Sequence, residues 1–253
     1  SWIRVSHEHP EFIVNVMETR RILLRHYKDM KNLKVITLDA VTFLHDGGAG
    51  DSTHPLSSLT ACQQCPIMMA DGGFKRSEEM ITMMDYTRNP PSRSRANFVH
   101  PNFGPVWVTS ALGNENVSLI GTDPVNHKEH AWKVVQVLKG QGGGSVFVKT
   151  HPEFRRNLYV DTPLNPGPPR SVSRSAVFNS GETGRALQGS SRLPIGPNWV
   201  KAPKRVVQPE YNKAGDEVWF SVWSGKEEES AIVIVDDKTL KLKTVIKDPK
   251  LIT

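Results

Sequence analysis

In His151-Pro-Glu-Phe-Arg-Arg-Asn-Leu-Tyr-Val160, a turn that contains proline comes directly before a short apolar strand. The same order recurs in His9-Pro-Glu-Phe-Ile-Val-Asn-Val16 and in His100-Pro-Asn-Phe-Gly-Pro-Val-Trp-Val108. A fourth copy, Gln208-Pro-Glu-Tyr211, leads into Glu217-Val-Trp-Phe-Ser-Val-Trp223. Proline favours turns and strand ends, whereas alternating or continuous apolar residues favour strands. We therefore predict that the chain repeats one β unit.

The spacing of the copies predicts the kind of repeat. They begin at residues 9, 100, 151 and 208, and His54-Pro55 lies near the middle of the first interval. A period of about 45 to 57 residues, with three or four short strands in each unit, is typical of β-propellers. Solenoids of paired helices share this period, but even Glu11 to Tyr27 reads as two strands around Glu18-Thr19. We predict an all-β protein, a partial β-propeller with about five blades' worth of sequence.

Other short segments fit the same unit. Val117-Ser-Leu-Ile-Gly121 is expected to form a strand before Thr122-Asp-Pro124. Ala231-Ile-Val-Ile-Val235 and Leu240-Lys-Leu-Lys-Thr-Val-Ile246 flank the turn Asp236-Asp-Lys238, which is the pattern of a hairpin. We expect this pair to be the outer hairpin of a blade.

Composition excludes several classes of protein. The 253 residues contain no apolar run of the length that a membrane span requires. The formal charge of +6 predicts an anionic partner, but basic and acidic residues are interspersed, so we expect no nucleic acid interface. The two cysteines are too few for a disulfide framework. No signal peptide opens the chain at Ser1, and we expect a fragment or a processed chain.

Two stretches depart from the repeat. Ala49 to Arg95 holds both cysteines and five of the seven methionines, and Pro163 to Pro203 is rich in Ser, Gly, Pro and Arg. Their composition predicts loops or disorder. Loops of this length are uncommon inside a compact domain, so both stretches are unusual.

Three motifs resemble haem-attachment, metal-binding or phosphate-binding motifs, but each lacks a required feature. Cys62-Gln-Gln-Cys65 is followed by Pro66 instead of the histidine of a haem attachment site, and it lacks the second ligand pair of a zinc site. His7-Glu-His9 lacks a third ligand nearby. Gly140-Gln-Gly-Gly-Gly-Ser145 lacks the spacing of a phosphate-binding loop and predicts a turn at a blade edge. We expect no metal site made by side chains of this chain alone.

His45 is the histidine whose setting favours a function. In Phe43-Leu-His-Asp-Gly-Gly48 it ends an apolar strand and opens a glycine-rich turn. Glycines let the backbone approach a ligand closely, and loops at strand ends carry functional residues. His9, His100 and His151 instead belong to the repeated turns, where we expect a structural role.

Eight stretches, in order along the chain, together carry a resemblance to a known family. They are Ser6-His-Glu-His-Pro-Glu-Phe-Ile-Val-Asn-Val16, Phe43-Leu-His-Asp-Gly-Gly48, Ala96-Asn-Phe-Val-His-Pro101, Leu119-Ile-Gly-Thr-Asp-Pro124, Gly140-Gln-Gly-Gly-Gly-Ser145, Lys204-Arg-Val-Val-Gln-Pro-Glu-Tyr-Asn-Lys213, Asp216-Glu-Val-Trp-Phe-Ser-Val-Trp223 and Val235-Asp-Asp-Lys-Thr-Leu-Lys-Leu-Lys243. These stretches resemble cytochrome cd1 nitrite reductase. The resemblance covers the C-terminal half or more of the haem d1 domain, which in that family is an eight-bladed propeller. It implies that residues 1–253 form a partial haem d1-binding β-propeller domain, with 49–95 and 163–203 as divergent stretches.

The resemblance implies a periplasmic denitrification enzyme that reduces nitrite to nitric oxide. Nitrite binds at haem d1, and the electron arrives from a c-type haem domain. A small c-type cytochrome or a cupredoxin would donate electrons to the parent enzyme, and family members are homodimers. The proximal iron ligand and the haem c attachment motif lie upstream of Ser1 in the family, so we expect the isolated chain to be inactive.

The resemblance also implies site residues. The removal of one nitrite oxygen as water takes two protons, and the family places two imidazoles above the iron as donors. One falls on His45 and the other on Pro91, which can neither donate a proton nor hold an anion. A nearby arginine that binds a haem carboxylate falls on Ser94, and the flanking Arg93 and Arg95 are candidates to replace it.

Three further positions correspond to residues that contact the haem d1 macrocycle. By similarity these are Phe147, Gln208 and Trp223, which would supply apolar packing and one polar anchor. Haem d1 carries several carboxylates, so it is an anionic partner that fits the positive charge of the chain.

The similarity is lost abruptly at 49–95 and 163–203 and returns in register. This is the pattern that two compensating reading-frame slips or sequencing errors produce, whereas divergence would scatter substitutions and keep the two-residue alternation of strands. The hypothesis predicts family-like strands in another frame of the encoding DNA.

Two other functions remain open at this stage. The chain is either a propeller interaction module without cofactor, in which His45 is only a turn residue, or a paralogue that carries haem d1 or dehydrogenates it during its biosynthesis. Uptake of haem d1 would argue against the first, and nitrite turnover in a restored full-length version would argue against the second.

Overall fold

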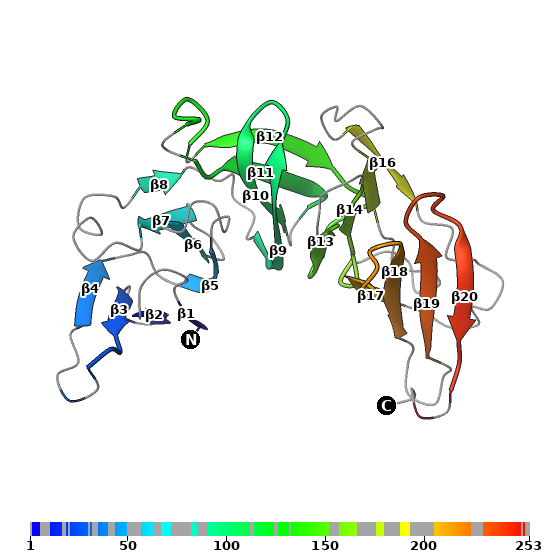
Figure 1. The fold of residues 1–253 in the computed structure, drawn as a ribbon, viewed down its shortest axis with the longest axis horizontal. Helices are drawn as coiled ribbons and strands as arrows, with labels where there is room; N and C mark the ends of the chain where they lie inside the picture. The colour runs from blue at the N-terminus through cyan, green and yellow to red at the C-terminus, as the bar shows by residue number, and fades with distance from the viewer. Residues whose placement is uncertain are drawn as a thin grey trace. The chain divides into compact units, whose positions relative to one another are not determined.

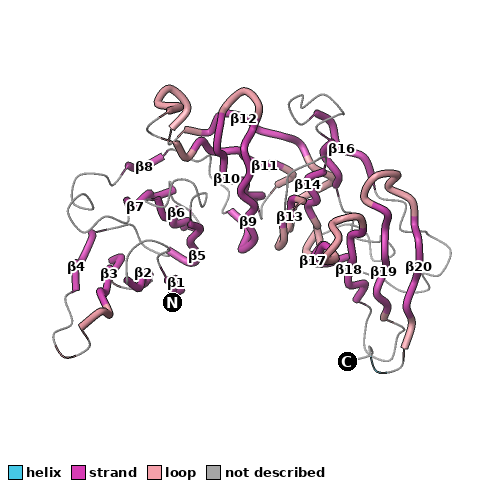
Figure 2. Tube along the Cα trace, viewed as in Figure 1, coloured by secondary structure: helices cyan, strands magenta, loops and turns pink. Residues whose placement is uncertain are grey.

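The computed structural model of the chain describes residues 2–5, 11–16, 19, 21–29, 31, 35–39, 44–49, 57–62, 67–71, 82–84, 91–111, 114–123, 126–131, 133–151, 157–165, 176–179, 188–192, 205–223, 230–248 and 250. These residues contain twenty strands and no α-helix (Figure 2). The strands form five sheets of four strands each. This architecture confirms the all-β prediction, and repeated four-stranded sheets are the blades of β-propellers.

The chain forms two compact units. The first consists of Ser1–Pro91, Phe103–Trp107 and Leu119–Val135, and the second of Ser92–Asn102, Val108–Ser118 and Gln136–Thr253. In the first unit, one antiparallel sheet has the order β1 (Trp2–Val5), β2 (Glu11–Val16), β3 (Arg21–His26) and β4 (Val35–Asp39). The other has the order β5 (Leu44–Ala49), β6 (Ser57–Cys62), β7 (Ile67–Asp71) and β8 (Thr82–Met84).

The second unit contains two complete antiparallel sheets. One has the order β13 (Val148–Thr150), β14 (Asn157–Val160), β15 (Ala176–Asn179) and β16 (Gln188–Arg192). The other has the order β17 (Arg205–Tyr211), β18 (Glu217–Trp223), β19 (Ala231–Asp236) and β20 (Leu242–Ile246), and its strands lie side by side in Figure 1. The remaining sheet, with β9 (Pro91–His100), β10 (Gly104–Ala111), β11 (Asn116–Gly121) and β12 (Val134–Lys139) in sequential order, contributes residues to both units.

The repeated Pro-containing motif marks one position in each sheet. The segments that begin at residues 9, 54, 100 and 151 lead into β2, β6, β10 and β14, each the second strand of its sheet. The fourth predicted copy differs, because Gln208 and Pro209 lie inside β17 and the turn before β18 is at residues 212–216. The period read from the sequence is therefore the period of the sheets.

Strands also occur in the two stretches for which composition indicates loops. β6, β7 and β8 lie between residues 49 and 95, and β15 and β16 lie between 163 and 203. β6, β8 and β16 carry little apolar alternation, as in Gln188-Gly-Ser-Ser-Arg192. β7 and β15 contain short apolar runs at 67–70 and 176–178, but the polar residues around them obscure this signal. Whether these stretches result from reading-frame slips stays a prediction.

The core of the last sheet follows from strand periodicity. Along β18, Val218, Phe220 and Val222 are buried and alternate with partly exposed residues, as a period of two requires. They pack with Val206, Val233, Val235 and Tyr159 from neighbouring strands. The rings of Tyr159 and Phe220 meet edge to face with centroids 5.8 Å apart.

A buried polar cluster ties β14 to this last sheet. The hydroxyls of Tyr159 and Tyr211 donate to Oδ1 of Asp237 at 2.6 and 2.8 Å. Asn157 Nδ2 donates to the carbonyl oxygen of Asp237 at 2.7 Å. Burial raises the pKa of both tyrosines, so their hydroxyls stay protonated donors. The cluster thus joins two sheets of the second unit through one carboxylate.

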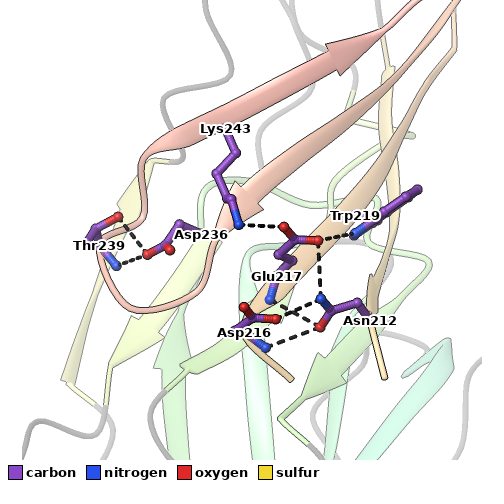
Figure 3. A network of polar contacts seen from close by, with 7 residues as sticks. All are labelled: Asn212, Asp216, Glu217, Trp219, Asp236, Thr239 and Lys243. Atoms are coloured by element: carbon purple, nitrogen blue, oxygen red, sulfur yellow. Dashed lines mark hydrogen bonds and ion pairs between the residues drawn. The ribbon is translucent and has the colours of Figure 1, made fainter. Parts of the chain in front are cut away.

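A second polar network shapes the two hairpin ends of the last sheet (Figure 3). Asn212 accepts from the amides of Asp216 and Glu217 at 3.2 and 3.3 Å, which closes the β17–β18 turn. Glu217 accepts from Trp219 Nε1 at 3.2 Å and pairs with Lys243 of β20. Asp236 accepts from the amide and the hydroxyl of Thr239, both at 2.7 Å. These contacts explain the predicted hairpin around 236–238, which the structure confirms.

Candidate functional site

Most of the candidate residues lie at the same place in their respective sheets. β5, β9, β13 and β17 are each the first strand along the chain and an edge strand of a four-stranded sheet. His45 lies on β5, Arg93 and Arg95 lie on β9, Gln208 lies on β17, and Phe147 directly precedes β13. First strands of successive sheets thus carry His45, Arg93, Arg95 and Gln208, whereas Phe147 lies next to a first strand and Trp223 ends β18.

His45 occupies a β-bulge. Leu44 pairs with Cys62 and Asp46 pairs with Ala61, so His45 is the extra residue between two registered pairs. The sequence predicts that His45 ends its strand, and this is wrong, because the strand continues through the glycines to Ala49. Bulges redirect a side chain and are frequent beside active sites. The side chain of His45 itself lies outside the described residues.

Gln208 occupies a second bulge. Val207 pairs with Ser221 and Glu210 pairs with Trp219, so β17 has one residue more than β18 between these pairs. The φ angle of Gln208 is 53°, in the left-handed region that favours glycine. Its side chain is exposed. Residues with a strained backbone are found frequently at binding sites, and Gln208 combines such a backbone with an exposed polar side chain.

The carboxylate of Asp161 connects the two lining candidates Phe147 and Gln208. Oδ1 accepts from the amides of Val146 and Phe147, both at 2.8 Å. Oδ2 accepts from the amide of Gln208 at 3.0 Å. Asp161 also donates its own amide to the carbonyl oxygen of Phe147 at 3.1 Å. One side chain therefore fixes the backbone at both candidates.

Asp161 is fully buried, with 0% of its side chain exposed. Burial raises the pKa of this carboxyl to about 6, although the hydrogen bonds from Phe147, Gln208, Val146 and Ser145 act in the opposite direction. Ser145 Oγ donates to Oδ1 of Asp161 at 3.5 Å and accepts from Ser110 Oγ at 2.7 Å. The group stays ionised at neutral pH and holds three amides.

The glycine-rich turn before Phe147 lets the chain reach Asp161. Gly144 has a φ of 72°, and a Cβ atom there would lie 2.4 Å from the backbone carbon of Leu164. Only glycine fits this close approach of two backbones. Residues 140–145 form the predicted turn. After this turn, the amide of Phe147 donates to Asp161, and the residue is half-buried.

Trp223 offers an apolar surface at the end of β18. It lies opposite Arg205 at the start of β17, three residues before Gln208, and 53% of it is exposed. The second unit thus carries an exposed indole at the end of β18, a half-buried phenyl ring before β13 and an exposed amide on β17.

For the candidates on β9, the structure describes the backbone. Pro91, Arg93, Ser94 and Arg95 follow one another along the strand, and their side chains lie outside the described residues. Arg93 and Arg95 are two positions apart, and residues at this spacing share a face of a strand. Both arginines therefore occupy alternate positions of β9, with Ser94 between them.

The histidines of the repeated turns have structural contacts, as the sequence predicts. Nδ1 of His100 accepts from the amide of Asn102 at 3.1 Å. Nε2 of His151 lies 2.9 Å from the carbonyl oxygen of Gly215, and its ring meets Tyr211 edge to face. His9 lies outside the described residues, as does Cys65 of the paired cysteines, while Cys62 lies on β6.

Sequence reasoning missed Asp161. The signal that would have found it is a carboxylate directly after a buried strand, in Asp161-Thr-Pro163. Thr122-Asp-Pro124 repeats it, and Asp123 is likewise buried and accepts from the amide of Asn126 at 3.0 Å. A buried carboxylate at such a position requires several donors.

No group of three or more His, Cys, Asp or Glu side chains in the described part of the chain is arranged to hold a metal ion. No described helix is long and apolar enough to span a bilayer.

Solved structures share this architecture. The chain is similar to dihydro-haem d1 dehydrogenase NirN, solved in complex with DHE, with a TM-score of 0.70, 16% identity, and coverage of 94% of this chain and 44% of that one. It is also similar to the Pseudomonas aeruginosa periplasmic gluconolactonase PpgL, with a TM-score of 0.64, 12% identity, and coverage of 98% and 71%. The protein is therefore a β-propeller, represented here by five blades.

Sequence comparison gives the family. The family model described as "Cytochrome D1 heme domain" matches residues 1–253. A nitrite reductase from Stutzerimonas stutzeri is 45% identical over 99% of this chain and 45% of its own length. The chain belongs to the cytochrome d1 haem domain family, and it spans less than half the length of this curated relative.

The described residues fit one side of a haem d1 site. A macrocycle offers a flat apolar face and polar edges, and the second unit carries the exposed ring of Trp223, the half-buried ring of Phe147 and the exposed amide of Gln208. The left-handed backbone of Gln208 is unusual for a residue other than glycine, and the buried carboxylate of Asp161 holds its amide.

Proposed function

We propose that this chain is the C-terminal part of the haem d1 domain of a dissimilatory nitrite reductase that forms nitric oxide. The observation that carries the proposal is the 45% identity to a nitrite reductase along 99% of the chain. The placement of most candidate residues on or next to the first strands of their sheets supports it.

Phe147, Gln208 and Trp223 hold the macrocycle in this proposal. The two aromatic rings exclude water from its apolar face, and the Gln208 amide forms hydrogen bonds with a polar edge. Arg93 and Arg95 occupy alternate positions of β9 and pair with haem carboxylates, for which guanidinium groups are suited.

His45 acts on nitrite. Haem d1, when bound, supplies the iron that binds nitrite and passes it one electron. His45 in its imidazolium form attracts the anion and donates one of the two protons that leave with an oxygen atom as water. The register shift at His45 marks a bulge in β5, a feature that is frequent beside active sites, and this supports the assignment.

We expect the chain on its own not to reduce nitrite. Pro91 stands where the family has its second imidazole, and it has no proton to donate. Water replaces this donor poorly because its proton is far less acidic than that of an imidazolium. Binding of haem d1 and turnover of nitrite are therefore separable properties here.

The setting of the parent protein is part of the proposal. We place it in the periplasm, as a homodimer that receives electrons through a haem c domain from a small c-type cytochrome or a cupredoxin. The formal charge of +6 suits the anionic cofactor.

Titration of the purified chain with haem d1, followed by absorption spectroscopy, tests the proposal. We expect saturable binding and a spectral change on addition of nitrite that is lost in His45→Ala. Absence of saturable binding at any pH between 6 and 8 would overturn the proposal and would favour a propeller interaction module without cofactor.

One alternative has support of its own. The chain has a TM-score of 0.70 with dihydro-haem d1 dehydrogenase NirN, so a protein that carries or dehydrogenates haem d1 is the second candidate function. A full-length version with histidine at position 91 separates the two: nitrite turnover favours the reductase, whereas haem uptake without turnover favours the paralogue.

A further inference from the structure

The carboxylate of Asp161 has the contacts of a residue that holds a binding edge. It is fully buried, it follows β14, and it accepts from amides of two other segments, the turn before β13 and strand β17. These amides belong to Val146, Phe147 and Gln208, of which the last two are lining candidates. An ionised group with this many donors is expensive to bury and strongly directional.

We propose that Asp161 is a positioning residue, which holds Phe147 and Gln208 in the geometry in which their side chains contact haem d1. This inference rests on the haem d1 binding proposed above. Asp161 does not touch the cofactor. Its two oxygens set the separation of the two backbones, Oδ1 at 2.8 Å from Phe147 N and Oδ2 at 3.0 Å from Gln208 N.

The backbone of Gln208 shows why a holding group is needed. A left-handed φ costs a non-glycine residue about 1 kcal/mol or more, so the bulge would relax without a restraint. The hydrogen bond to Asp161 supplies the restraint, because rotation about the backbone at Gln208 turns its amide away from Oδ2. The side chain of Gln208 then stays exposed in one direction.

Asp161→Asn tests the assignment, with Asp237→Asn as its matched control. Both aspartates are buried in the second unit, but Asp237 holds Tyr159 and Tyr211 in the polar cluster. In Asp161→Asn one oxygen becomes an amide nitrogen, which must face an N–H donor. We expect its affinity for haem d1 to fall about tenfold, as loss of a charge-assisted contact does. Asp237→Asn is expected to lose stability and to keep its affinity when folded.

A double-mutant cycle separates positioning from general destabilisation. When Phe147 and Gln208 are both changed to alanine, the further change of Asp161 to asparagine should cost less than twofold in affinity, because nothing remains to be positioned. An equal loss in both backgrounds contradicts the inference. Failure of the unaltered chain to bind haem d1 refutes the proposed function, whereas equal binding by the unaltered chain and Asp161→Asn refutes only the positioning role.

Measuring haem d1 affinity against pH tests the assignment in a chain that keeps Asp161, so it does not depend on whether Asp161→Asn folds. The titratable or charged side chains on the elements around Asp161 are Lys149, His151, Tyr159, Arg205, Glu210 and Tyr211. In a chain that carries His45→Gln and His151→Gln, imidazoles at these positions no longer contribute. We expect haem d1 affinity to fall as the pH drops below about 6, where burial has placed the pKa of Asp161. A flat profile from pH 7.5 to 5 overturns the assignment.

Discussion

Gln208 combines a backbone that favours glycine with a side chain that glycine lacks. Its φ of 53° lies at the bulge of β17, and its amide is held by Asp161. The sequence predicts Gln208 as a lining residue by resemblance alone. The bulge was not foreseeable, because no local pattern in Val206-Val-Gln-Pro-Glu210 indicates a left-handed residue followed by proline.

Gln208→Gly should separate stability from binding. Glycine relieves about 1 to 2 kcal/mol of left-handed strain and costs about 0.5 to 1 kcal/mol of chain entropy. We expect the free energy of unfolding in urea to rise slightly and haem d1 affinity to fall. A variant that binds haem d1 as well as the unaltered chain would remove Gln208 from the site.

The titration of Asp161 should be visible in stability. Burial raises its pKa from 3.8 to about 6 in the folded protein. Between these values the folded state binds more protons than the unfolded state, so this group stabilises the protein at low pH and its contribution is lost as pH rises through about 6. The unfolding free energy of the unaltered chain minus that of Asp161→Asn should therefore decrease from pH 4 to pH 7. A difference that increases with pH would show that hydrogen bonding outweighs burial.

At the scale of elements, prediction succeeded where each strand carries its own signal. β2, β10, β14 and β18 are apolar and follow the repeated motif, and β18 alternates as a half-buried strand should. This signal is missing from β6, β8 and β16 and obscured in β7 and β15, and pairing with neighbouring strands is what places them in sheets. Tertiary context overrides local preference for strands more than for helices.

Truncation of the central ring of β18 tests the core of the last sheet. Phe220 is fully buried and contacts Tyr159. We expect Phe220→Ala to lower the free energy of unfolding by about 3 to 5 kcal/mol, as large core truncations do. Val222→Ala, at the end of the same strand, should cost about half as much. Equal losses in urea titrations would mean that the cavity at position 220 closes.

The polar cluster between β14 and the last sheet should respond to loss of one hydroxyl. Tyr159→Phe leaves Asp237 with fewer donors inside the protein, so we expect a loss of about 1 to 3 kcal/mol in the free energy of unfolding. Tyr211→Phe removes the second hydroxyl at the same oxygen, and the two changes should not be additive. Additive losses would show that the hydroxyls act independently.

At the scale of the whole molecule, the five four-stranded sheets and the family match agree along the entire chain. The sequence predicts the period, the strand class and the family because all three depend on local patterns that recur. The sequence does not predict that one carboxylate holds the backbone amides of both Phe147 and Gln208. This carboxylate belongs to Asp161, which lies fourteen residues from Phe147 and forty-seven residues from Gln208 in the sequence.

The origin of the two divergent stretches is also a question about the whole chain. If compensating reading-frame slips produced 49–95 and 163–203, the encoding DNA read in another frame should give alternating strands that resemble the family and a histidine at position 91. Resequencing of the gene decides the matter. Absence of such strands in both other frames means that the printed residues are genuine and that Pro91 belongs to the protein.

The central claim is that the chain binds haem d1 through residues on or next to the first strands of its sheets together with Trp223 at the end of β18. An absorption titration with haem d1 of the unaltered chain, Trp223→Ala and Trp219→Ala tests it most directly, because Trp219 lies on the same strand but donates to Glu217 within the hairpin network. We predict saturable binding that weakens about tenfold in Trp223→Ala and stays unchanged in Trp219→Ala. Equal binding by all three chains, or no binding by any, would contradict the account.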